Sequence, residues 1–224
     1  MACVSFILDR SGSMYQCITD TLGGFNCFIE NQKKDNENGV MSLHFFNNSY
    51  STIYQKKPIG EVEELTTQVY RPSGGTALLD SIGITITNVA KETHSVPPTI
   101  VILTDGYENA SVKYTQSHIN DLIKLYKEKD NWNFVFLAAN QDAIQVGNQL
   151  GIPEESAMTF SPDTVQQAFE GLSSALGRQQ TGEDEHVTFT GLERQASQPP
   201  TPGPSEVFTG EAYNYPESQG LGRC

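Results

Sequence analysis

Apolar and polar positions along the first half of the chain predict strands and helices in alternation. The apolar run at residues 3–8 predicts a strand, and apolar residues at helical spacing over residues 15–34 predict a helix. The runs VMSLHFF and SYSTIY, on either side of NNS, predict a hairpin. The loop SGGT then leads into a second helix with apolar positions at helical spacing.

The second half of the chain repeats this alternation. Residues 100–103 are continuously apolar, which is typical of a central parallel strand buried on both faces. A helix around residues 116–129, the strand NFVFLAA, a short helix in QDAIQVGNQLGI, the strand SAMTF and a last helix follow. Ser161 is the expected N-cap of that helix, with Pro162 at its first position. The order predicts an α/β fold with a largely parallel sheet, right-handed crossovers and one antiparallel edge strand.

The composition changes near residue 179. From there the chain is rich in Gly, Pro, Ser and Gln, carries seven acidic residues and two arginines, and has no apolar period. We therefore expect a folded domain over residues 1–178 and an acidic, disordered tail over residues 179–224. Two aromatic islands in it, HVTFTGL and EVFTGEAYNY, could order against a partner.

Charge and cysteine content narrow the functional classes. The formal net charge is -13, which argues against binding a phosphate backbone and leaves metal cations or basic partners as candidates. The four cysteines are scattered and form no C-x-x-C pair, as expected of free thiols in a reducing compartment. No leader sequence and no apolar stretch near the roughly 20 residues of a membrane helix is present. We expect a soluble cytoplasmic protein that binds neither nucleic acid nor membrane.

Polar side chains follow the predicted strands where these end. Asp9, Ser11 and Ser13 follow the first strand in DRSGS, Asp105 follows the central strand in TDG, and Thr76 precedes a helix in GGT. In a parallel sheet such positions gather at one edge. Two carboxylates and three hydroxyls are hard oxygen donors, which suit Mg²⁺ or Mn²⁺.

These three motifs, in this order, resemble the von Willebrand factor A domain, also called the integrin I-type domain, over residues 3–177. The resemblance implies a doubly wound six-stranded sheet with helices on both faces and an intact metal-ion-dependent adhesion site (MIDAS). It implies that Ser11 and Ser13 ligate the ion, that Thr76 ligates it in the open form, and that Asp9 and Asp105 hold it directly or through water. A partner's carboxylate then completes the coordination. The chain looks most like the compact stand-alone versions of bacteria and their phages.

We therefore predict a non-enzymatic, metal-dependent protein-interaction module that binds an Asp or Glu residue of a partner protein through Mg²⁺ or Mn²⁺. The alternative is a Mg²⁺-dependent phosphoryl-transfer hydrolase or a metal-handling subunit of an enzyme complex. The haloacid-dehalogenase-like loop, however, has a second aspartate two residues after the nucleophile, where this chain has Ser11. RSGSM is not a serine-hydrolase elbow, and GGTALLDS lacks the lysine of a P-loop. A scaffold without metal is a third possibility.

Three smaller features carry expectations of their own. Gly23 and Gly24 interrupt the first helix, which predicts close packing against the sheet or, alternatively, a hinge. Glu108 follows Asp105 closely and could be a further ligand or an exposed loop residue. Acidic side chains of the tail could occupy the open metal position of the same or another copy, which would give self-association through the tail.

Overall fold

The computed structural model describes residues 2–139 and 143–198, whose strands form a six-stranded sheet in the order β3-β2-β1-β4-β5-β6. The strands are β1 (Cys3–Asp9), β2 (Val40–Phe46), β3 (Tyr50–Pro58), β4 (Thr99–Thr104), β5 (Asn133–Ala139) and β6 (Ala157–Phe160). Only the β2–β3 pair is antiparallel within this sheet, and β3 lies at its edge. The predicted α/β class, with one antiparallel edge strand, is confirmed.

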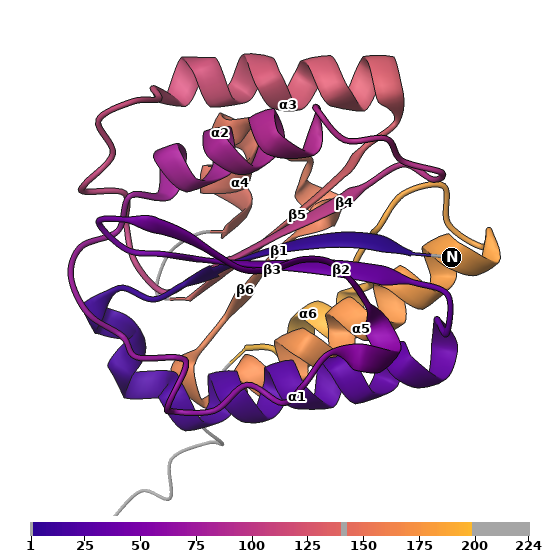
Figure 1. The fold of residues 1–224 in the computed structure, drawn as a ribbon, viewed down its shortest axis with the longest axis horizontal. Coiled ribbons are helices and arrows are strands. Elements are labelled where there is room, and N and C mark those ends of the chain that lie inside the picture. Colours follow the sequence, from indigo (N-terminus) through magenta and orange to yellow (C-terminus); the bar gives the residue numbers. More distant parts are fainter. Residues whose placement is uncertain (1, 140–142, 199–224) are drawn as a thin grey trace, which may run out of the picture.

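Helices cover both faces of the sheet (Figure 1). The helices α1, α5 and α6 lie on one face, and α2, α3 and α4 lie on the other. Their bounds are α1 (Ile18–Asp35), α2 (Leu78–Val89), α3 (Gln116–Asp130), α4 (Ala143–Leu150), α5 (Val165–Thr181) and α6 (Gly191–Ala196). Short 3₁₀ turns are η1 (Gly12–Cys17), η2 (Ile59–Glu61), η3 (Glu154–Ser156) and η4 (Pro162–Thr164). This is the doubly wound arrangement that the sequence predicts.

Two apolar cores, one on each face, follow from the alternation of side chains along the strands. Phe6 and Leu8 of β1 and Leu103 of β4 belong to the core under α1 and α5. Ile7 and Ile102, at the intervening positions, belong to the core under α2, α3 and α4. Because both faces are covered, every residue of β4 is buried.

The two glycines of α1 differ in their surroundings. A Cβ added to Gly24 would lie 2.4 Å from Cδ2 of Phe169 on α5, whereas nothing lies within 4 Å of one added to Gly23. Phe169 in turn stacks on Phe6 of β1 at 5.8 Å between ring centroids. The close approach at Gly24 is therefore between two helices, not between helix and sheet as the sequence suggested.

Residues 179–198 are part of the folded unit. The helix α5 continues to Thr181, and the side chains of Val187 and Phe189 are buried in the α1–α5 core. The expectation of a disordered tail is therefore wrong for residues 179–198, because two apolar side chains of the first aromatic island find a place in the core. The remainder of the predicted tail, residues 199–224, lies outside the described residues.

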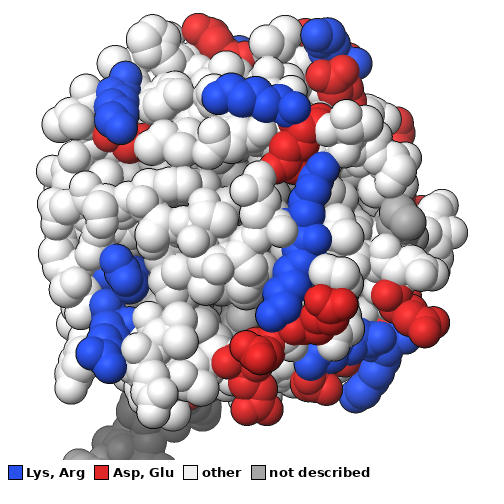
Figure 2. All heavy atoms as spheres, in the orientation of Figure 1, with Lys and Arg blue, Asp and Glu red and all other residues white. Residues whose placement is uncertain are grey.

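The surface in Figure 2 carries charges of both signs, with Lys and Arg side chains lying among Asp and Glu. Within residues 2–139 and 143–198, none of the helices is both long and apolar enough to cross a membrane. In the same part of the chain Cys3, Cys17 and Cys27 are free thiols.

Candidate metal centre

The candidate site lies where β1 and β4 end side by side. Leu8 of β1 pairs with Leu103 of β4 in parallel register, so both strands end at the same edge of the sheet. Asp9 is the last residue of β1, and Asp105 follows β4 directly. Because the neighbours of β1 are β2 on one side and β4 on the other, this is the switch point of the sheet, where ligands bind in open α/β folds.

Ser11, Ser13 and Asp105 form a line of hydrogen-bonded side chains. The Ser13 Oγ donates to Asp105 Oδ1 at 2.6 Å, and it lies 3.1 Å from the Ser11 Oγ. Ser11 and Asp105 are buried while Ser13 is exposed, so the Ser13 hydroxyl joins two buried side chains at the surface. The predicted spacing of the two serines therefore directs both hydroxyls to the loop after β4.

Asp9 is fully buried, and both of its carboxylate oxygens accept hydrogen bonds. Its Oδ1 accepts from the Ser11 backbone N–H at 2.6 Å, and its Oδ2 accepts from the Thr104 hydroxyl at 2.6 Å. Sequence reasoning did not assign a role to Thr104, although it stands immediately before Asp105 in the TDG motif. The hydroxyl of Thr104, at the end of β4, fixes the orientation of the Asp9 carboxylate at the end of the adjacent strand β1.

Thr76 reaches the same place from the loop before α2. A Cβ added to Gly106 would lie 3.1 Å from the Thr76 Oγ1 and 3.4 Å from the Ser13 Oγ. The missing side chain of Gly106 therefore leaves a small cradle into which hydroxyls from two loops project. The structure thus brings all five predicted residues together, with the hydroxyls of Thr76 and Ser13 next to the same Cβ position of Gly106.

Asparagine side chains hold the Thr76 loop in position. Asn109 Oδ1 accepts a hydrogen bond from the Thr76 N–H at 2.8 Å, and the Asn109 N–H donates to the Thr76 carbonyl at 3.0 Å. Asn48 Oδ1 accepts from the Gly75 N–H at 2.7 Å. From the sequence, Asn109 was expected only at the rim of the site, because it follows Asp105 closely, and Asn48 was not singled out. The role of both side chains in holding the Thr76 loop was not predicted, because each lies in a polar loop of ordinary turn composition.

Glu108 has a structural role at the start of α2. Its carboxylate accepts hydrogen bonds from the N–H groups of Leu79, Ala110 and Ser111 and from the Ser111 hydroxyl, at 2.7–2.9 Å. A negative charge at this end of a helix is also favourable because of the helix dipole. Both carboxylate oxygens of Glu108 therefore already accept hydrogen bonds, from three backbone N–H groups and the Ser111 hydroxyl. This disfavours the suggested role of Glu108 as a further metal ligand.

The electrostatics of the site favour a cation. Burial raises the pKa of Asp9 to about 6, against the hydrogen bonds from Thr104 and Ser11 and with the help of the charge of Asp105. Burial also raises the pKa of Asp105, although the Ser13 hydroxyl opposes it. Two carboxylates that have lost part of their hydration lie close together, and a positive charge between them would offset that loss.

The donor set fits a hard divalent ion. Its members are carboxylate and hydroxyl oxygens, the ligand type of Mg²⁺ and Mn²⁺, without imidazole or thiolate. Within residues 2–139 and 143–198, His, Cys, Asp and Glu side chains form no group of three or more that could hold a metal ion. A metal ion bound here would need hydroxyl ligands beside the two carboxylates, and the cradle at Gly106 gathers two hydroxyls.

Sequence comparisons assign no family: no family model matches the chain, and no curated protein matches it. Solved structures do resemble it. The von Willebrand factor domain of the type V pili tip protein Mfa5 from Porphyromonas gingivalis has a TM-score of 0.58 at 10% identity, covering 78% of this chain and 94% of that one. The pilus adhesin SpaC from Lactobacillus rhamnosus GG, in an open conformation, has a TM-score of 0.61 at 13% identity, covering 80% and 30%.

A third similar structure is proximal thread matrix protein 1 from the mussel byssus, with a TM-score of 0.57 at 17% identity over 79% of this chain. Another structure of that protein has a zinc-occupied MIDAS motif. The chain spans 46% of the length of the mussel protein, less than half. At these identities the comparisons show the fold alone: the chain has the fold of a von Willebrand factor A domain.

Proposed function

We propose that this chain is a metal-dependent protein-interaction module whose Asp9, Ser11, Ser13, Thr76 and Asp105 hold Mg²⁺ or Mn²⁺. The partner would be a protein that offers an Asp or Glu carboxylate to the ion. The observation that carries the proposal is the convergence at Gly106, where the Thr76 Oγ1 and the Ser13 Oγ lie 3.1 Å and 3.4 Å from a Cβ position while Ser13 also bonds Asp105.

The donor set explains why a partner's acid would be attracted. A bound divalent ion would supply positive charge and an exchangeable coordination position. The five side chains include only two carboxylates, and hydroxyls carry no charge that would compete with an incoming acid. Ser11 and Asp9, on the buried side, would hold the ion from below, while the exposed Ser13 faces the solvent from which a partner approaches.

Two tyrosines could provide the surrounding contact surface. Tyr15 and Tyr107 are 72% and 64% exposed, and they stand close in sequence to Ser13 and Asp105 respectively. Exposed tyrosines supply large apolar area at low entropic cost and are enriched in protein interfaces. We propose that they contact the partner around its metal-bound carboxylate.

The fold supports this class of function, since structures with the same fold include a pilus adhesin and a matrix protein with a zinc-occupied MIDAS. A non-enzymatic role, a cytoplasmic location and the stand-alone bacterial or phage type remain predictions from the sequence.

The direct test is calorimetric titration of the full chain with Mg²⁺ and with Mn²⁺. We expect one site, at least tenfold weaker in Ser13→Ala and in Asp105→Asn. Asp20→Asn is the matched control, because Asp20 is an exposed carboxylate on α1 outside the site. Glutarate, added to the Mn²⁺-loaded chain as a simple dicarboxylate, should displace metal-bound water and lower the water proton relaxation rate.

Equal metal affinity in all four proteins would contradict the proposed ligands, and metal binding without a glutarate effect would contradict the proposed mode of partner binding. Turnover of a phosphate ester that requires Mg²⁺ and is lost in Asp9→Asn would instead support the phosphoryl-transfer alternative.

A further inference from the structure

The segment 187–198, which we call the strap, lies beside the open edge of the sheet. Within the described sheet β6 is an edge strand paired with β5, so its other side faces away from the ladder. Side chains of the strap bond the carbonyls of this side. The Arg194 guanidinium donates to the Ala157 carbonyl at 2.8 Å, and Ser197 Oγ and Gln198 Nε2 donate to the Thr159 carbonyl at 2.8 Å and 3.2 Å. The strap therefore occupies the place of a further strand without forming one.

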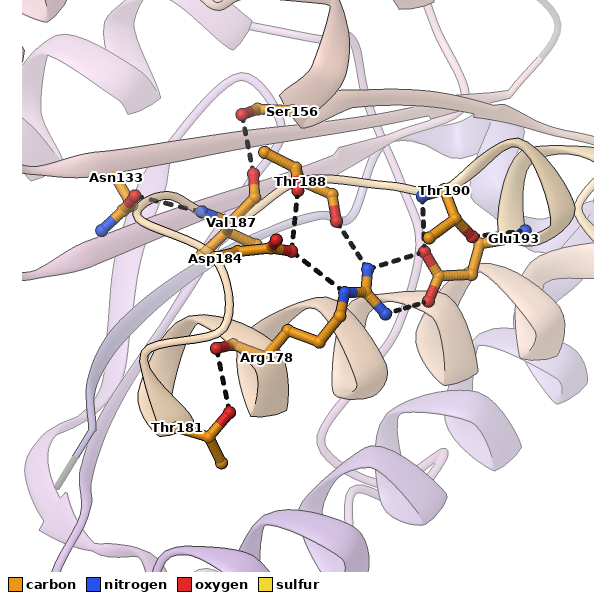
Figure 3. A network of polar contacts seen from close by, with 9 residues as sticks. All are labelled: Asn133, Ser156, Arg178, Thr181, Asp184, Val187, Thr188, Thr190 and Glu193. Atoms are coloured by element: carbon orange, nitrogen blue, oxygen red, sulfur yellow. Dashed lines mark hydrogen bonds and ion pairs between the residues drawn. The ribbon is translucent and has the colours of Figure 1, made fainter.

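The start of the strap is buried in the core under α1 and α5, beside β6, and we call the place that Val187 and Phe189 fill the slot. Val187 and Phe189 are 1% and 6% exposed. Their backbones are bonded as well: the Phe189 N–H donates to the Glu155 carbonyl at 2.8 Å, and the Ser156 Oγ donates to the Val187 carbonyl at 2.7 Å. The Val187 N–H donates to Asn133 Oδ1 at 3.2 Å, as Figure 3 shows. Apolar burial and hydrogen bonds thus fix the strap to the start of β5 and to η3, immediately before β6.

Arg178 at the end of α5 clasps the strap (Figure 3). Its two terminal nitrogens donate to the two carboxylate oxygens of Glu193 at 2.7 Å and 2.9 Å, a fork that carboxylates match well. The same guanidinium donates to Asp184 Oδ2 at 3.0 Å and to the Thr188 carbonyl at 2.8 Å. One side chain therefore joins α5, the strap and the segment that connects them.

The connecting segment, residues 182–186, is a short polar hinge. Gly182 caps α5 with φ of +77°, a left-handed conformation that glycine adopts without strain. Glu183 and Glu185 are exposed, and a Cβ on Gly182 would meet nothing within 4 Å. The direction in which the strap leaves α5 therefore depends on the backbone of Gly182 and on the bonds that Arg178 makes to the connecting segment, which include those from the Glu183 and Asp184 N–H groups to its carbonyl at 3.0 Å and 3.2 Å.

We propose that the slot beside β6 also accepts the strap of a second copy of this chain, so that two copies can exchange straps and form a dimer. Exchange reproduces the contacts that residues 187–198 make with α5, β5 and β6, and so needs no new complementary surface. The short hinge normally favours a chain's own strap, because it holds that strap at high effective concentration. This proposal is independent of the metal site, and its self-association is distinct from capture of tail carboxylates by a metal.

The test is to change the hinge without substituting any residue of the slot or the clasp. Gly182→Pro cannot adopt φ of +77°, since the proline ring fixes φ near about −65°. Proline at position 182 also lacks the N–H that bonds the Arg178 and Gln179 carbonyls, so it removes this cap of α5 as well. We expect Gly182→Pro to lower the dimer dissociation constant at least tenfold in sedimentation velocity of the full chain. Gly182→Asn tolerates the left-handed conformation and should behave as the unchanged chain. Gly191→Ala, a glycine of α6 with open space around it, is the second control.

Hydrogen exchange then identifies the bound segment. In the Gly182→Pro dimer the Phe189 amide should stay protected, because the strap is docked on the other copy. The double variant Gly182→Pro/Arg178→Gln should lose both the dimer and this protection. Three results would overturn the proposal: a Gly182→Pro chain that remains monomeric, a dimer that survives the loss of Arg178, or loss of the native circular dichroism in Gly182→Pro, which would mean that the strap cannot leave its own domain.

Discussion

Thr76 and Asn109 hold each other through two hydrogen bonds, in which Asn109 Oδ1 accepts from the Thr76 N–H and the Thr76 carbonyl accepts from the Asn109 N–H. This pair joins the loop before α2 to the loop after β4. The position of the Thr76 hydroxyl therefore depends on a side chain that is not itself a proposed ligand.

Asn109→Ala should weaken Mn²⁺ binding without removing a ligand. The Thr76 N–H loses its acceptor, so its loop is no longer fixed, and loss of such a supporting contact typically costs about 10–100-fold in metal affinity. Calorimetry on the variant measures this directly. Asn38→Ala, at an exposed asparagine far along the chain from the site, should bind as the unchanged protein does. An unaltered affinity in Asn109→Ala would show that the loop is positioned by other contacts.

Substitutions of Asp9 should separate metal binding from folding. Asp9→Ala leaves the buried Ser11 N–H without its acceptor, while the Thr104 hydroxyl keeps the Gly106 carbonyl at 3.2 Å, so we expect it to cost about 1–3 kcal/mol of stability as well as metal binding. Asp9→Asn keeps an oxygen for Ser11 and can donate to Thr104, so it should lose metal binding and stay close to native stability. Urea unfolding with and without Mn²⁺ distinguishes the two. Equal stability of both variants would contradict this account of Asp9.

The two glycines of α1 should respond to alanine in opposite directions. Gly24→Ala would place a Cβ 2.4 Å from the ring of Phe169, and such overpacking typically costs about 1–3 kcal/mol. Gly23→Ala meets open space and should stabilise the helix by up to about 1 kcal/mol. Chemical denaturation of the two variants gives the comparison. Stabilisation by both would mean that α1 and α5 can separate without cost, as a hinge would require.

His44 makes stability depend on pH. It is buried beside Tyr50, with its Nδ1 3.0 Å from the Thr52 hydroxyl, and burial lowers its pKa to about 4 against the opposing charge of Glu92. The unfolded chain has a histidine pKa of about 6.5, so below that pH it binds a proton that the folded chain does not. Stability contributed by neutral His44 is therefore complete above about pH 6.5 and falls between there and pH 4, by up to about 3 kcal/mol.

The measurement is urea unfolding between pH 7.5 and pH 4.5. His44→Gln should be less sensitive to pH across this range, whereas His118→Gln, at an exposed position, should keep the full dependence. If the His44 variant lost stability on acidification as steeply as the unchanged chain, other groups would account for the effect.

The strands and most helices could be predicted because their apolar periods are regular, and the continuous run of β4 matches a strand covered on both faces. The proximity of the candidate residues could be predicted because strand ends meet at one edge of a parallel sheet, which brings Asp9 and Asp105 together whatever the details of the loops. The supporting role of Asn48 and Asn109 could not be predicted, since an amide side chain in a polar loop has no distinctive pattern. Their roles depend on distances between loops far apart in the sequence.

The strap was missed for a different reason. Its composition resembles that of a disordered segment, and its order depends on Arg178, which in the sequence is only a basic residue near the end of a helix. One local signal was present: Thr190 and Glu193 have capping-box spacing, and in the structure they form that box at the start of α6. Val187 and Phe189 are two positions apart, and nothing in the sequence indicates which part of the core their side chains join.

Anomalous diffraction from crystals grown with Mn²⁺ and acetate tests the central claim most directly. We predict one strong manganese peak at about 2.0–2.3 Å from the Ser11 and Ser13 hydroxyl oxygens. Asp9, Thr76 and Asp105 should surround it, with an acetate oxygen or a water completing the coordination on the solvent side. A well-ordered crystal with no peak at the ends of β1 and β4, or with manganese bound only elsewhere, would contradict it.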